Sequence, residues 1–149
     1  MSDAQNAAHD LQRFVDAQAP VYEQVGAELR SGRKRTHWMW FVFPQIAGLG
    51  KSAMAQRFAI ASLDEARAYA NHPVLGPRLK ECTRWVNETE GRSIDHIFGY
   101  PDDLKFRSSM TLFAHATSDN AEFLQALSKY FGSEFDPLTL ERLGLARQA

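Results

Sequence analysis

The residues best suited to chemistry begin with an aromatic segment in the first third of the chain, which carries His37, Trp38, Trp40, Gln45 and Lys51. An imidazole can transfer protons, an indole face can hold a flat ring, and an ammonium group can bind an anion. We therefore name His37 as a candidate acid/base residue and the other four as candidate ligand-binding residues. A histidine whose hydrogen bonds are satisfied within the core is the alternative for His37.

A second polar group follows later in the chain, where Lys105, Ser108 and Ser109 share one face of an expected helix. A lysine beside hydroxyl groups can bind phosphate, or deprotonate a serine if desolvation lowers the lysine pKa. We name Lys105 as the candidate electrostatic anchor of catalysis and both serines as candidate ligand-binding residues. The alternative is close packing between helices, with Lys105 paired to Asp102 or Asp103.

A glycine-containing loop, residues 48–52, ends like a phosphate-binding P-loop. That motif requires a further glycine at the position that Gln45 occupies, and it sits in a parallel sheet that this chain has no alternating strands to build. A nucleoside triphosphatase is therefore not expected. Anion binding at a helix N-terminus beside Lys51 stays open.

The metal-ligating residue types lack the spacing of a metal site. The five histidines show neither zinc-finger nor His-Glu-x-x-His spacing, and the chain has one cysteine, Cys82. We expect no metal and no other cofactor. Because Cys82 falls on an apolar helical stripe with Leu79 and Val86, we expect a buried, inert thiol.

Composition narrows the class of protein. The chain has 149 residues, enough for one domain with its own core, and its charges nearly cancel at a net charge of -1. We therefore expect neither a nucleic-acid nor a membrane partner, and we expect the basic cluster Arg30–Arg35 to be a solvated loop before the core. A lone cysteine, no apolar N-terminal segment and no apolar run of about 20 residues indicate a cytoplasmic protein.

The elements that must position these residues are helical. Apolar residues recur at helical spacing, Ser62–Glu65 and Asp119–Glu122 read as capping boxes, and Pro77 predicts the start of the longest helix of the middle third. Residues 10–145 are therefore expected to form one compact all-α domain of about seven to eight helices, after a flexible N-terminus, residues 1–9. Residues 38–43 are expected to be buried, whether helical or extended.

Several of these motifs occur together in a known family. They are His37–Gln45, Gly48–Gly50, His72–Gly76, Asp102–Lys105 and Ser108–Phe113. With them the chain resembles the bacterial domain-of-unknown-function family 1810, over Asp10 to about Leu143. The resemblance implies a mainly helical domain with no established activity. Some members carry the label calpastatin, but that inhibitor type is extended and disordered, whereas this composition is globular.

A weaker similarity is to the NADAR N-glycosidases, which act on ADP-ribose-like compounds. Their pattern has a glutamate before the histidine, where this chain has Thr36 before His37, and their Trp-Gly signature is absent. Our functional hypothesis is that the domain binds or processes a small anionic aromatic metabolite, nucleotide- or ADP-ribose-like, near the His-Trp-Met-Trp stretch. The alternative is a protein-interaction domain in which that stretch is only core.

Overall fold

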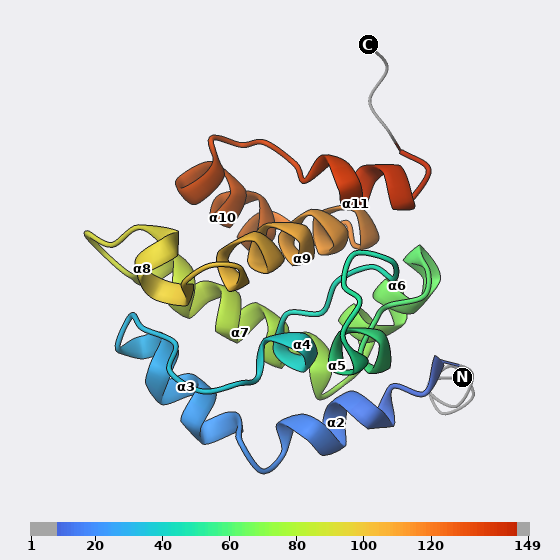
Figure 1. The fold of residues 1–149 in the computed structure, drawn as a ribbon, viewed down its shortest axis with the longest axis horizontal. Helices are drawn as coiled ribbons and strands as arrows, with labels where there is room; N and C mark the ends of the chain where they lie inside the picture. Colours follow the sequence, from blue (N-terminus) through green and yellow to red (C-terminus); the bar gives the residue numbers. More distant parts are fainter. Residues whose placement is uncertain (1–8, 146–149) are drawn as a thin grey trace.

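A computed structural model describes residues 9–145 of the chain, and these residues form ten α-helices (Figure 1). The helices are α2 (Gln12–Gln18), α3 (Tyr22–Arg30), α4 (Met39–Val42), α5 (Ala53–Arg57), α6 (Leu63–Asn71), α7 (Leu75–Glu88), α8 (Ile94–Phe98), α9 (Asp102–Ala116), α10 (Ala121–Phe131) and α11 (Pro137–Arg142). The predicted all-α class is confirmed: the described residues contain no strand beyond an isolated parallel bridge between Ile46 and Ile60. The predicted flexible segment, residues 1–9, lies outside them apart from His9.

Helix α9 occupies the centre of the fold. It packs against α6, α8, α10 and α11, and Figure 1 shows it between the α10–α11 layer and α7. Phe106, Met110, Leu112 and Phe113 are fully buried, so the helix is apolar on most of its sides, as a helix inside a core must be. Helix α7 is the second central element, in contact with α3, α6 and α10.

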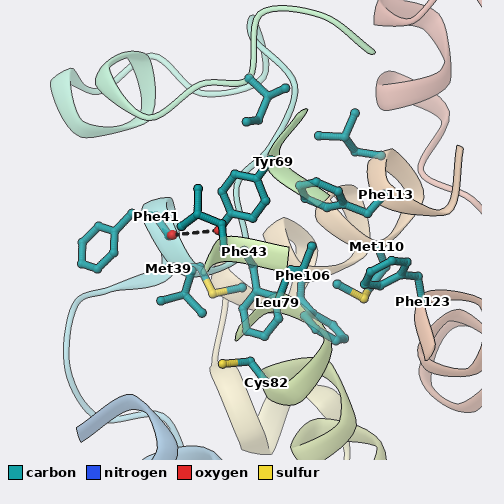
Figure 2. Close-up of a cluster of buried hydrophobic side chains, with 14 of the residues drawn as sticks. Met39, Phe41, Phe43, Tyr69, Leu79, Cys82, Phe106, Met110, Phe113 and Phe123 are labelled. Atoms are coloured by element: carbon teal, nitrogen blue, oxygen red, sulfur yellow. Dashed lines mark hydrogen bonds between the residues drawn. The ribbon is translucent and has the colours of Figure 1, made fainter. Parts of the chain in front are cut away.

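Residues 38–43 are buried as predicted, apart from the half-buried Trp40, and residues 39–42 form a single helical turn, α4. Phe43 points toward α9, where its ring meets that of Phe106 edge to face, with centroids 5.0 Å apart. The Tyr69 hydroxyl donates to the Phe41 carbonyl at 3.3 Å (Figure 2). Together these contacts fix the segment against α6 and α9.

Helix starts follow the sequence where the cap is local. Four N-cap side chains each accept a backbone N–H at 3.1 Å: Ser52, Ser62, Ser93 and Asp136. The helix start predicted at Ser62 is thereby confirmed. The predicted capping box at Asp119 is wrong. There Asn120 precedes α10 without a side-chain cap and donates to the Ala114 carbonyl at 2.8 Å, while Asp119 pairs with Lys80.

The ends of α7 are completed by residues outside the helix. It begins at Leu75 rather than at Pro77, because the His72 Nδ1 accepts the N–H groups of Val74 and Leu75 at 3.0 and 3.2 Å. At its other end, the Tyr130 hydroxyl donates to the carbonyl of Val86, and the Lys129 ammonium donates to those of Asn87 and Thr89. All three distances are 2.6 Å. Side chains of α10 therefore satisfy carbonyls that a helix end leaves unpaired.

Residues 9–145 contain neither a helix that could span a membrane nor a group of side chains that could hold a metal ion. None of their helices combines the length and the apolar character that crossing a membrane requires. Nor do three or more of their His, Cys, Asp and Glu side chains gather where they could hold a metal ion.

Candidate functional site

A buried carboxylate fixes the start of the aromatic segment. Glu28 on α3 is 3% exposed and accepts hydrogen bonds from the N–H groups of Arg35 and Thr36, the Thr36 hydroxyl, the Trp38 indole and the Gln24 amide, at 2.7–3.1 Å. Burial alone would raise the pKa of this carboxyl group, but the donors outweigh it and lower the pKa to about 2. Glu28 therefore holds the chain that leads into α4.

Sequence reasoning missed Glu28, although a signal was present. The residue follows Val21 by seven positions and Val25 by three, so it falls on the apolar stripe of α3. A charged side chain on an apolar stripe indicates a buried polar contact. Its partners lie beyond the helix, where spacing gives no information.

A shared carboxylate links the aromatic segment to α9. The Asp102 side chain lies 2.8 Å from the Lys34 ammonium and 3.4 Å from that of Lys105. Lys34 lies over the Trp38 ring, 5.2 Å from its centroid, and Lys105 lies over the Trp40 ring at 5.5 Å. The expected solvated loop is therefore wrong for Lys34, whose side chain is 7% exposed. The Lys105–Asp102 pair that packing alone would predict is present.

A cavity of about 460 Å³, which we call the Lys105 cavity, lies beside this group. It is bounded by the loop between α4 and α5, the start of α9 and the start of α11. Its lining consists of Gln45, Leu49, Gly50, Pro101, Leu104, Lys105, Arg107, Ser108, Asp136, Pro137 and Leu138. The fold thus brings three of the predicted site residues, Gln45, Lys105 and Ser108, to one cavity.

Two polar groups of this cavity remain available. Within residues 9–145, neither the Lys105 ammonium nor the Gln45 side-chain amide makes a hydrogen bond, and Lys105 has only its 3.4 Å ion pair with Asp102. The Lys105 side chain is 25% exposed. A ligand that enters the cavity can therefore reach one cation and one amide without displacing a protein hydrogen bond.

Most of the other polar groups of the cavity form hydrogen bonds within the fold. The Ser108 hydroxyl lies 2.9 Å from Asp136 Oδ2, which also accepts from the backbone and hydroxyl of Thr139. Arg107 donates through Nε and Nη2 to the carbonyls of Glu134 and Phe135, at 3.1 and 3.0 Å. These bonds fasten the chain before α11 to α9, and they account for a serine in the middle of a helix.

The remaining predicted site residues do not line the Lys105 cavity. His37 and Lys51 are exposed, while Trp38 and Ser109 are buried. The Ser109 hydroxyl finds no partner among the described residues. Trp40 is half-buried and meets the cavity only through Lys105, which covers its ring. The proposed roles of these five residues stay predictions.

Other sites offer less chemistry. Three further cavities of about 520–540 Å³ are lined by none of the residues predicted from the sequence. Cys82 is fully buried, and burial raises the pKa of its thiol to about 12, which fits the inert thiol that we expect. The Lys105 cavity is therefore the candidate site.

Comparisons with known proteins found a matching family model and a similar solved structure. A family model described as "Protein of unknown function (DUF1810)" matches residues 8–143. A crystal structure of the conserved hypothetical protein Rv1873 from Mycobacterium tuberculosis is 60% identical, with a TM-score of 0.91. The match covers 92% of this chain and 98% of that one. No curated protein matches.

Proposed function

Because the chain belongs to the DUF1810 family of proteins of unknown function, whose description carries no activity, we propose a function from its own geometry. We propose that the domain binds a small anionic organic molecule in the Lys105 cavity. The observation that carries this proposal is the available Lys105 ammonium, which lies beside the available Gln45 amide in a largely apolar cavity. Apolar walls with a few convergent polar groups are typical of ligand sites, and about 460 Å³ is within their usual size.

The pairing of Asp102 favours anion binding by Lys105. If Lys105 turned to a ligand, Asp102 would keep its shorter ion pair with Lys34. The carboxylate would then not be left without a cation, which is the costly outcome for a partly buried charge. The Lys105 ammonium also makes a cation–π contact with the Trp40 ring, which leaves its N–H groups free to donate hydrogen bonds to a ligand.

The sequence predicts a nucleotide- or ADP-ribose-like ligand. In that version of the proposal, a phosphate group binds Lys105 and Gln45 accepts or donates a further hydrogen bond. His37, the predicted acid/base residue, lines no described cavity, so the proposal is one of binding and contains no catalytic step.

The test is a thermal-shift and calorimetric screen with adenosine monophosphate, ADP-ribose and small carboxylates, because a ligand that binds only the native state raises the melting temperature. The Lys105→Met variant should lose at least tenfold in affinity for any anion that binds. Lys80→Met is the matched control, since Lys80 also pairs with an aspartate, Asp119, and does not line the cavity. Equal loss in both variants, or no binding at all, would overturn the proposal.

A protein-interaction domain is the second candidate, and exposed apolar side chains favour it. Leu104 and Leu138 line the cavity and are 48% and 59% exposed, and the neighbouring Tyr100 is 78% exposed. Exposed apolar groups at one place can mark a docking surface. Saturable binding of a small anion that depends on Lys105 favours the ligand site; its absence favours the second candidate.

A further inference from the structure

The apolar part of the Lys105 cavity contains no aromatic side chain. Its apolar lining comes from three leucines and two prolines: Leu49, Leu104, Leu138, Pro101 and Pro137. A flat ring would find aliphatic edges there and no ring face to stack on. The wall chemistry therefore matches a hydrocarbon chain better than a nucleobase.

The two tryptophans do not change this conclusion. Trp38 is 1% exposed, and its indole N–H is already bonded to Glu28 at 2.9 Å. The ring of Trp40 is covered by Lys105, and the void that it lines has a volume of about 10 Å³. Such a void holds about one water molecule, so a nucleobase does not fit between Trp40 and the loop that faces it.

The polar groups of the cavity indicate the charge of the ligand head. The charged side chains that line the cavity are Lys105, Arg107 and Asp136, two cations and one anion, which sum to one positive charge. The Lys105 ammonium and the Gln45 amide make no hydrogen bond with a described residue, whereas Arg107 donates through Nε and Nη2 to backbone carbonyls. A carboxylate has two oxygens, which one ammonium and one amide can serve, and one negative charge, which the net charge of the lining balances. A diphosphate carries more charge than this lining balances.

From these observations, and resting on the proposed function, we propose that the ligand is an aliphatic monocarboxylate. Its carboxylate binds the Lys105 ammonium and the Gln45 amide, and its alkyl chain lies against the leucines and prolines of the cavity. Leu104 and Leu138 are about half exposed at present, and an alkyl chain would cover them. Their exposure in a cavity wall is then a feature of the ligand site rather than of a protein interface.

The chain length of the ligand provides a quantitative signature. Each methylene group moved from water into an apolar site increases affinity about three- to fourfold. Affinity measured by calorimetry should therefore rise roughly tenfold from butanoate to hexanoate, and roughly tenfold again to octanoate, all below their micelle concentrations. Octanol, which has the same chain without the charge, should bind at least tenfold more weakly than octanoate.

Matched variants measure separately how much the carboxylate and the alkyl chain of the ligand contribute to its affinity. Lys105→Met should remove the preference for octanoate over octanol, while Lys80→Met, outside the cavity, keeps it. Leu138→Ser should weaken octanoate at least threefold, whereas Leu124→Ser, at an exposed leucine on α10 outside the cavity, should leave it unchanged. Circular dichroism and melting temperatures establish that each variant is folded.

The outcomes distinguish this inference from the function on which it rests. Lys105-dependent binding of adenosine monophosphate or ADP-ribose without binding of octanoate would overturn the aliphatic ligand and leave the anion site standing. Binding of none of these molecules would overturn both. Octyl phosphate that binds more tightly than octanoate would replace the carboxylate by a phosphate head. Binding only of a leucine-rich acidic peptide would make the cavity a docking surface.

Discussion

Lys34 and Lys105 share the Asp102 carboxylate, and each lies over one tryptophan of the aromatic segment. The Lys34 side chain is almost fully enclosed and pairs at 2.8 Å, next to a tryptophan that Glu28 also holds. Lys105 pairs at 3.4 Å at the edge of a cavity. On the Lys34 side of Asp102, lysine, tryptophan and carboxylate groups thus form a fully paired structural contact, which together with Glu28 we call the anchor. On the Lys105 side, the same residue types leave a site open to a ligand. Which lysine is free for function is decided by the donors and acceptors around it.

The largest loss of stability is expected from replacing Glu28, which accepts the most hydrogen bonds in the anchor. Replacing Glu28→Ala removes the acceptor of five hydrogen bonds and leaves buried donors without partners, so it should lower the free energy of unfolding by about 4 kcal/mol. Chemical denaturation measures this. Glu23→Ala, at an exposed position on the same helix, is the control and should change the stability by about 0.5 kcal/mol or less. Similar losses in both variants would mean that Glu28 is no anchor.

Acid should weaken the anchor in a defined range. The pKa of Glu28 is lowered in the folded state from 4.5 to about 2, so its contribution is complete above pH 4.5 and is lost as the pH falls toward 2. The expected loss in the free energy of unfolding is about 3 kcal/mol. Denaturation curves across this range should show the loss in the wild type. The Glu28→Gln variant should lack this part of the slope, and an unchanged slope would contradict the assignment to Glu28.

The two lysines should differ in stability as well as in binding. Lys34→Met breaks the shorter ion pair and should cost about 1–2 kcal/mol, whereas Lys105→Met should cost about 0.5 kcal/mol or less. Only the Lys105 variant should lose affinity for an anionic ligand. The reverse order of stabilities would contradict the assignment of Lys34 to structure and of Lys105 to binding.

The smallest effect is expected from the two tryptophans. Trp38→Phe removes the indole donor of Glu28 and should cost about 1 kcal/mol, while Trp40→Phe loses no hydrogen bond with a described residue and should cost less than about 0.5 kcal/mol beyond the change in ring size. Parallel thermal melts of the two variants give the difference directly. Equal costs would show that the indole–carboxylate bond adds nothing measurable.

The sequence predicted the helix caps and buried faces that depend on residues close together in the chain. The caps at Ser62 and Asp136 bond to N–H groups three residues away, so their spacing is visible in the chain, and the buried stripe of α9 is visible in its periodicity. The capping box at Asp119 failed because α10 starts one residue later, after Asn120, whose side chain bonds to the Ala114 carbonyl, while Asp119 pairs with Lys80 from another helix. Local spacing holds only while no distant partner competes.

The candidate site was predictable in part for the same reason. Lys105 and Gln45 were identified from their types, and both line the cavity. Lys34 was placed in a solvated loop, because its partner Asp102 comes from the start of a helix far along the chain. The identity of the cavity wall also depends on α11, whose docking on α9 through Ser108 and Arg107 has no local signature.

Side chains of α10 form hydrogen bonds to the end of α7 and so link two helices that lie far apart in the sequence. Without Lys129, the Asn87 and Thr89 carbonyls have no other partner among the described residues, so we expect the end of α7 to fray in any state that lacks α10. We therefore expect these two helices to unfold together. A nascent chain that ends before α10 would lack Phe123, Ala126 and Leu127 of the core as well as the bonds that complete α7.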